Sequence, residues 1–156
     1  MDPNKLKQFD TLINAAHLMM RGEAGAARDR CPFPVSEIDP VGLKLEAFTI
    51  GALVVMCATC DLPRDSDTLR LIAYLLYLKE PGEDDPLAAA ERALLYEDHQ
   101  EFGPYFDQGS HSALSILRGE PDSVGRYAAA LQADPPPRGE DGRSHRKRFA
   151  ATRYFQ

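Results

Sequence analysis

Hydrophobic residues recur at helical spacing along most of this 156-residue chain, starting close to its first residue. Asp2-Pro3 has the form of an N-cap followed by a proline in the first turn, where the missing N–H is not needed. The apolar stripe weakens at Gly22 and Gly25, and the two prolines within 31–34 break any helix. The pattern predicts a first helix whose apolar face consists of Leu6, Phe9, Leu12, Ile13, Ala16, Met19 and Met20.

A second helix is expected after Asp39-Pro40, which repeats the same start signal. From Ala47 to Cys60 the sequence contains no charged residue. A helix that is apolar on every side must be buried on every side, so we predict that this segment is the central core helix.

A third helix is predicted to start at a cap formed by Asp65 or Ser66 and to end at Pro81-Gly82. Its predicted inward face consists of Leu69, Ile72, Leu75 and Leu76, flanked by Tyr74 and Tyr77. Asp85-Pro86 is the third start signal of this kind and opens an alanine-rich helix that should end at Gly103-Pro104. Its predicted inward residues are Leu87, Ala90, Leu94 and Leu95.

Two shorter helices are expected next, one over 110–117 and one from Pro121 or Asp122 to Leu131. The second has Val124, Tyr127, Ala128 and Leu131 at helical spacing. The fold class is therefore predicted as all-α, a five- to six-helix bundle with a central apolar helix and a basic C-terminal arm. Three prolines at 135–137 favour an extended chain and divide the sequence into an acidic helical domain, 1–134, and a proline-led arm, 135–156.

Charge is distributed unevenly over this sequence, whose formal net charge is −6. The segment 138–156 has six basic and two acidic residues, so the remainder of the chain carries −10. Nine acidic residues against one basic residue, Arg92, lie within 80–107, which gives this 28-residue segment a charge of −8. Such a segment is typical of a solvated face that favours solubility, or of a docking face for a basic partner.

The two charged regions supply the predicted partner-binding residues. In the arm, basic and aromatic residues alternate. This composition suits binding to a protein groove or to the phosphates and bases of a nucleic acid. A third interpretation is that the arm folds back on its own acidic body. The predicted arm residues are Arg143, Arg146, Lys147, Arg148, Phe149, Arg153, Tyr154 and Phe155. Those of the acidic segment are Glu97, Asp98 and Glu101.

Cysteines and acidic residues offer little sign of a metal or redox site. Cys57 and Cys60 form a Cys-x-x-Cys pair, but at the C-terminal end of the predicted core helix, where the helix dipole does not stabilise a thiolate. With Cys31 they are interpreted as structural thiols of a reducing compartment. Asp61, Asp65 and Asp67 do not fit a calcium-binding loop, because the glycine and the glutamate that such a loop requires are missing.

No catalytic constellation is predicted either. His17 is interpreted as packed, His111 as lying near a helix start, and His99 lacks the Glu-x-x-His spacing of a di-iron bundle. No serine lies in a nucleophile elbow, and no glycine-rich phosphate loop is present in the sequence. We therefore expect no enzyme activity, no metal and no cofactor.

The resulting hypothesis is a non-enzymatic helical interaction protein, an adaptor or small subunit of a larger cytoplasmic assembly, with a protein as its partner. One alternative is a small subunit of a nucleoprotein complex with the arm on phosphates. Another is an immunity or inhibitor protein whose acidic face blocks a basic toxin. The sequence has no apolar run long enough for a membrane span and no signal-peptide pattern, so no membrane partner is expected.

Overall fold

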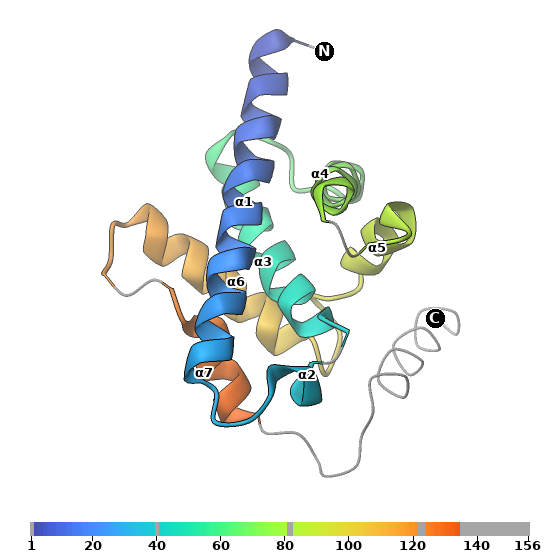
Figure 1. Cartoon of the computed structure of the whole chain (residues 1–156). Helices are drawn as coiled ribbons and strands as arrows, with labels where there is room; N and C mark the ends of the chain where they lie inside the picture. The colour runs from blue at the N-terminus through green and yellow to red at the C-terminus, as the bar shows by residue number, and fades with distance from the viewer. Residues whose placement is uncertain (1, 40, 81–82, 122–123, 135–156) are drawn as a thin grey trace.

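The computed structural model describes residues 2–39, 41–80, 83–121 and 124–134, and every regular element within these ranges is a helix (Figure 1). The all-α prediction is confirmed, whereas the predicted basic arm lies outside the described residues. One helix, the single-turn α2, was not predicted. The helices are α1 (Pro3–Arg30), α2 (Val35–Ile38), α3 (Leu43–Thr59), α4 (Ser66–Lys79), α5 (Pro86–Ala93), α6 (Gly103–Leu117) and α7 (Arg126–Ala133).

Three predicted helix starts are confirmed by their capping hydrogen bonds. The carboxylates of Asp2, Asp65 and Asp85 each accept a hydrogen bond from a backbone N–H two or three residues further on, at 3.1, 2.7 and 3.0 Å. These bonds satisfy N–H groups that have no partner inside the helix. Asp65, and not Ser66, is therefore the cap of α4.

The start of α3 differs from a simple Asp-Pro cap. The residue that precedes the helix is Gly42, whose φ of +70° suits glycine. The buried carboxylate of Asp39 still caps α3 from a distance, because it accepts hydrogen bonds from the backbone N–H groups of Lys44 and Leu45, both at 3.1 Å.

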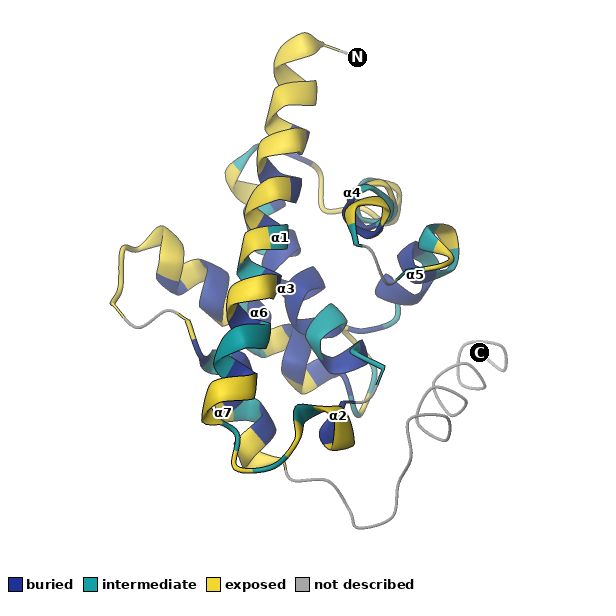
Figure 2. Cartoon of the chain, in the orientation of Figure 1, coloured by how far each residue is buried: buried dark blue, intermediate teal, exposed yellow. Residues whose placement is uncertain are grey.

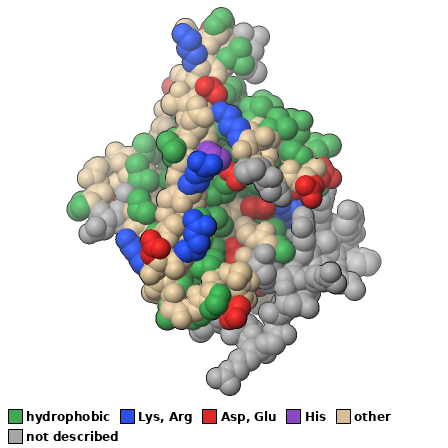
Figure 3. All heavy atoms as spheres, viewed as in Figure 1, with side chains coloured by type: hydrophobic (Ala, Val, Ile, Leu, Met, Phe, Trp, Pro, Cys, Tyr) green, Lys and Arg blue, Asp and Glu red, His purple; other side chains and the backbone are tan. Residues whose placement is uncertain are grey.

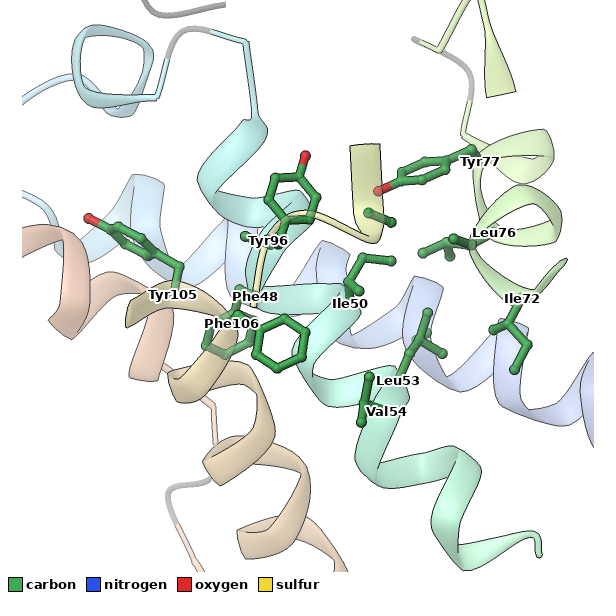
Figure 4. Close-up of a cluster of buried hydrophobic side chains, with 14 of the residues drawn as sticks. Phe48, Ile50, Leu53, Val54, Ile72, Leu76, Tyr77, Tyr96, Tyr105 and Phe106 are labelled. Atoms are coloured by element: carbon green, nitrogen blue, oxygen red, sulfur yellow. The ribbon is translucent and has the colours of Figure 1, made fainter. Parts of the chain in front are cut away.

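The central position predicted for the apolar helix is confirmed. Figure 2 shows α3 mostly buried, with α1 in front of it, and Figure 4 shows Phe48, Ile50 and Leu53 of α3 in the core. Its most extensive packing is against α6. From α4 come Ile72 and Leu76, which are fully buried as predicted.

Two glycines allow the close packing of α3 and α6. A Cβ atom on Gly51 would lie 1.9 Å from the backbone oxygen of Phe106, and one on Gly109 would lie 1.8 Å from that of Phe48. The Ser110 hydroxyl donates to the Gly51 carbonyl at 3.0 Å across the same contact. The two backbones therefore touch, and any larger residue at either glycine would force the helices apart.

The first helix ends at Arg30, just before the prolines predicted to break it, but it is less uniformly packed than its pattern indicated. Gly22 and Gly25 lie in open space within α1, which continues to Arg30. Leu6 was assigned to the buried stripe, but it is 54% exposed because the first turns of α1 extend beyond the other helices (Figures 1 and 2). Burial of the stripe begins at Phe9.

The end predicted for the alanine-rich helix, which is α5, is wrong. Helix α5 ends at Ala93, and Gly103 begins α6 instead of ending a helix. The Gly103 N–H donates to the His99 carbonyl at 2.7 Å, and a Cβ on Gly103 would lie 3.0 Å from the Glu97 carbonyl oxygen. The close approach of the Glu97 carbonyl favours a glycine at this position, and Pro104 fits the first turn of α6.

The inward face of α5 also differs from the prediction. Leu87 is 60% exposed, while Ala90 is buried as predicted. The other inward residues are Ala89, Arg92 and Ala93, and Leu94 and Leu95 are half-buried. Small side chains bring α5 close to α4, which leaves the large Leu87 outside.

At the C-terminal end, Tyr127, Ala128 and Leu131 are buried as predicted, whereas Val124 is 48% exposed and precedes the helix. Helix α7 starts only at Arg126 because its first N–H groups are capped from α1. The buried Glu23 carboxylate accepts hydrogen bonds from the N–H groups of Gly125 (3.1 Å) and Tyr127 (3.4 Å).

Candidate functional site

A pocket of about 310 Å³ lies between α1, the start of α3, the end of α4 and the segment leading into α5. We call it the charged pocket. Its apolar lining consists of Met20, Ala24, Val41, Leu43 and Leu45. Its polar lining consists of Arg21, Glu46, Tyr77, Glu80, Glu83 and Arg92.

The base of the charged pocket is a buried ion pair between α3 and α5. Arg92 Nη2 lies 2.9 and 2.8 Å from the two carboxylate oxygens of Glu46, and Arg92 Nε lies 3.1 Å from Oε2. The two side chains are only 9% and 14% exposed. Such a bidentate pair fixes both direction and distance, so it holds α5 against the first turn of α3.

Two further side chains complete this arrangement. The Tyr96 hydroxyl donates to Glu46 Oε2 at 2.5 Å, and Arg92 Nη2 also reaches Glu83 Oε2 at 3.3 Å. Glu46 therefore accepts from two donor residues and Arg92 contacts two carboxylates. These hydrogen bonds satisfy most of the donors and acceptors of Glu46 and Arg92, two charged side chains that would be costly to bury alone.

Burial and charge shift the pKa values of this cluster in different directions. Burial raises the pKa of Glu46, and the Arg92 guanidinium acts against that rise. Burial by itself lowers the pKa of Arg92, but the Glu46 carboxylate more than reverses this, so the net shift is upward and Arg92 stays a cation. Burial, followed by the charge of Glu46, raises the pKa of Tyr96, which keeps its hydroxyl a donor.

Tyr77 is the exception in this well-paired site. Its side chain extends from α4 toward the segment that bears Tyr96 (Figure 4) and lines the charged pocket. Although Tyr77 is only 2% exposed, its hydroxyl has no hydrogen-bond partner among the described residues. Burial, and then the nearby Glu46 charge, raises the pKa of Tyr77, so the hydroxyl retains its proton.

A contact between α1 and the end of α4 lies beside the charged pocket, whose lining includes Glu80. His17 Nδ1 lies 2.7 Å from Glu80 Oε1, and both side chains are half-buried. Burial raises the pKa of Glu80, while His17 and Arg21 lower it. His17, predicted to be packed, thus has a specific carboxylate partner.

The three acidic residues predicted to bind a partner lie together between α5 and α6, apart from the lining of the charged pocket. Glu97 and Asp98 are exposed, and Glu101 is half-buried. Arg64 Nη2 forms an ion pair with Glu97 Oε1 at 2.6 Å, with the two side chains 63% and 51% exposed. We call these three residues the acidic turn. The predicted arm residues from Arg143 to Phe155 lie outside the described residues.

Several other carboxylates of the acidic segment have internal partners. Besides Glu80 and Glu83, Glu91 lies 2.6 Å from Arg70 Nε, and Asp85 is the cap of α5. In Figure 3, basic side chains are spread along α1, and acidic side chains are scattered over the face, some of them on the side where Figure 1 places α4 and α5. Some carboxylates of the acidic segment therefore support the fold, whereas those of the acidic turn are largely exposed.

The cysteines lie where the sequence placed them. Cys57 is buried in the last turns of α3, where burial raises its pKa to about 11, and Cys60 is the residue that ends this helix. The Cys31 thiol faces the Ala128 carbonyl at 3.8 Å. Within the described part of the chain, no three His, Cys, Asp or Glu side chains form a group that could hold a metal ion.

Two histidines differ in role. His99 Nδ1 accepts hydrogen bonds from the N–H groups of Glu101 (3.1 Å) and Phe102 (3.3 Å), which supports the turn before α6. His111 was expected near a helix start, but it lies in the middle of α6 and is exposed. The earlier start of α6 at Gly103 explains this error.

Four residues of the charged pocket and its ion pair were not predicted to belong to a site: Glu46, Tyr77, Tyr96 and Arg92. A signal was present for two of them. Glu46 is a lone acid at the start of an apolar helix, and Arg92 is the only base in the acidic segment. A lone charge in such a context usually requires a partner.

Comparisons with known proteins found no matching family model, curated protein or solved structure. Among the described helices, none is long and apolar enough to cross a membrane.

Proposed function

We propose that this chain is a non-enzymatic helical interaction protein, an adaptor or small subunit of a larger assembly, that docks a basic protein partner through the acidic turn. The observation that carries the proposal is that Glu97 and Asp98 are exposed, while the one basic residue of the acidic segment, Arg92, forms a buried ion pair. Arg92 is buried against Glu46 and Glu83, so it adds no positive charge to the surface of the acidic turn.

The ion pair between Arg64 and Glu97 supports the same proposal. Both side chains are more than half exposed, and exposed pairs of this kind contribute little to stability. A partner with arginine or lysine side chains can replace Arg64 at low cost. Exposed charges that the fold does not require are well suited to steering and orienting a partner.

The basic and aromatic arm from Arg143 to Phe155 is proposed as a second contact with the same assembly. Its aromatic residues would supply buried contact area, and its basic residues would supply orientation. Replacing Arg146, Lys147 and Arg148 with alanine should weaken association without lowering the melting temperature of the helical body.

The test is affinity capture of the full-length chain from its native cells, with quantitative identification of what it retains. The variant Glu97→Gln/Asp98→Asn/Glu101→Gln should lose the partner. The matched control Asp29→Asn/Glu37→Gln/Glu120→Gln removes three carboxylates from exposed positions elsewhere and should keep it. Equal capture by both variants contradicts the proposal.

Nuclease treatment and the arm variant separate the alternatives. Loss of all partners after nuclease treatment favours a subunit of a nucleoprotein complex, whose binding should also fall steeply with salt. One stoichiometric basic protein that is retained by the arm variant, and lost from the acidic-turn variant, favours an inhibitor that blocks a toxin.

A further inference from the structure

We propose that in the free chain the C-terminal arm, residues 135–156, binds to an apolar face on the outside of α4 and α5. The face is formed by five side chains on the sides of these helices that point away from the core: Leu71, Tyr74, Leu75, Leu78 and Leu87. We call it the outer apolar face. The inference goes beyond the proposed function and does not depend on the acidic turn, none of whose residues belongs to this face.

The α4 part of the outer apolar face is a continuous stripe. Its four residues occupy positions i, i+3, i+4 and i+7, which follow one another along one side of a helix. Leu71 and Leu78 are 40% and 54% exposed, and Tyr74 and Leu75 between them are half-buried. The opposite side of α4 packs into the core (Figure 4), so this helix has a second apolar side that the described residues leave uncovered.

Leu87 of α5 extends the stripe. Arg70 Nε and Glu91 Oε1 are 2.6 Å apart where α4 and α5 meet at the surface. Tyr74 lies one turn after Arg70, and Leu87, which is 60% exposed, lies one turn before Glu91. Because the short connection 80–85 reverses the chain, these two turns lie level with each other. In Figure 3, hydrophobic side chains gather where Figure 1 places α4, and contiguous patches of this kind mark interaction sites.

The charge around the outer apolar face favours the arm as its occupant. The face is bordered by four carboxylates and two bases: Asp67, Asp84, Asp85 and Glu91, with Arg70 and Lys79. The segment 138–156 carries a charge of +4 and includes Phe149, Tyr154 and Phe155. Its aromatic rings can cover the leucines of the face, while its arginine and lysine side chains approach the carboxylates.

A second group of exposed apolar side chains, at the end of α6, lacks this complementarity. Leu114 and Leu117 are 36% and 52% exposed. Arg118 and Arg126 lie at this end of the helix, with Glu120 as a counter-charge for Arg118. A basic segment therefore gains less attraction there, so the end of α6 provides a matched control surface.

The arm starts within reach of the outer apolar face. The carboxylate of Asp134, the last described residue, lies 3.6 Å from Lys44 Nζ at the start of α3. Two residues further along α3, Glu46 pairs with Arg92 of α5. The 15 residues from Asp134 to Phe149 can span about 45 Å, several times the ~10 Å diameter of one helix. Because the arm is tethered, its local concentration at the face is about millimolar, so even weak binding is populated.

The test uses a tryptophan placed in the arm. The sequence contains no tryptophan, so Phe155→Trp gives the full-length chain a single fluorescent reporter. On the outer apolar face the indole is shielded from water, so it should emit at shorter wavelength, and be quenched less by acrylamide, than in the urea-unfolded chain. Leu71→Ser/Leu87→Ser in this background should shift the emission to longer wavelength and increase the quenching. The matched control Leu114→Ser/Leu117→Ser should change neither, and equal emission of the two leucine variants would overturn the proposal.

A second measurement leaves the helices unchanged, so it does not depend on how the leucine variants fold. In the full-length ¹⁵N-labelled protein, Phe149→Ser/Tyr154→Ser should move the backbone N–H signals of the outer apolar face and leave those of Leu114 and Leu117 in place. Shifts confined to the acidic turn would overturn the proposed location. Emission of the tryptophan that depends on protein concentration would show that the arm of a second copy covers the face, and would overturn binding within one chain.

Discussion

Two ion pairs, each with one residue in the acidic segment 80–107, illustrate how differently charge can act in this protein. Arg92 and Glu46 are 2.8 Å apart with both side chains nearly buried, and Arg64 and Glu97 are 2.6 Å apart with both side chains mostly exposed. The exposed pair is the shorter of the two, yet water screens its attraction and its side chains lose entropy on pairing. Burial, rather than distance, therefore separates charges that hold the fold from charges available to a partner.

The buried pair is not a source of great stability by itself. Removing two charges from water costs about as much as their attraction returns, so an apolar pair in the same place can be equally stable. The pair matters most when one member is removed, because the other charge is then buried without a partner and strongly destabilises the folded state. This makes the Glu46 and Arg92 pair a strong determinant of where α5 lies and a sensitive point for substitution.

The largest expected difference is between two arginine substitutions. Arg92→Met leaves Glu46 and Glu83 without their cation and should lower the free energy of unfolding by about 3–5 kcal/mol. Arg64→Met, which removes the exposed partner of Glu97, should lower it by less than about 1 kcal/mol. Urea denaturation of both variants measures this, and equal losses would contradict the distinction drawn here.

A smaller difference is expected between two tyrosines. Tyr96→Phe removes the donor to Glu46 and should cost about 1–3 kcal/mol in unfolding free energy. Tyr74→Phe, on the half-buried side of α4, should change it by less than about 0.5 kcal/mol. If Tyr96→Phe is as harmless as Tyr74→Phe in thermal and urea unfolding, Glu46 is adequately bonded by Arg92 alone.

Substitutions at two neighbouring exposed aspartates distinguish the stability contributed by a helix cap from that contributed by a surface charge. Asp85 caps α5, so Asp85→Ala should cost about 1 kcal/mol, while Asp84→Ala removes the same charge one residue earlier and should cost less than about 0.5 kcal/mol. Helical content by circular dichroism and urea unfolding report the difference. A larger loss for Asp84→Ala would mean that the assigned cap is not the residue that supports α5.

The smallest effect concerns pH. Burial raises the pKa of Glu23, although hydrogen bonds from Gly125 and Tyr127 oppose the rise. The folded state therefore holds this proton more tightly than the unfolded chain, so the contribution is full below the unfolded pKa of about 4.3 and is lost as pH rises through the folded pKa. Glu23→Gln should make the fall in unfolding free energy over this range less steep. An unchanged slope would contradict the assignment.

Much of this fold could be predicted from periodicity and start signals, because those depend on neighbours along the chain. The Asp-Pro starts and the buried central helix are of this kind. The start of α7 could not be predicted, since it depends on Glu23 more than 100 residues earlier. The turn at Gly103 depends on contact with the Glu97 backbone, which no local pattern reveals.

The charged pocket was harder to foresee than the fold. Its residues come from four regions of the chain, and their roles follow from which charges the fold buries together. Counting charge along the sequence locates the acidic segment. It could not show that Glu83 and Arg92 point inward while Glu97 and Asp98 face water.

The most direct test of this division is a pair of double-mutant cycles on unfolding free energy. One cycle uses Glu46→Met and Arg92→Met, and the other uses Glu97→Met and Arg64→Met. The buried cycle should give a coupling of about 2–3 kcal/mol, with the double variant more stable than either single variant. The exposed cycle should give less than about 1 kcal/mol. Couplings of equal size, or a larger one for the exposed pair, would contradict the claim that burial separates the charges that hold the fold from the charges that contribute little to it.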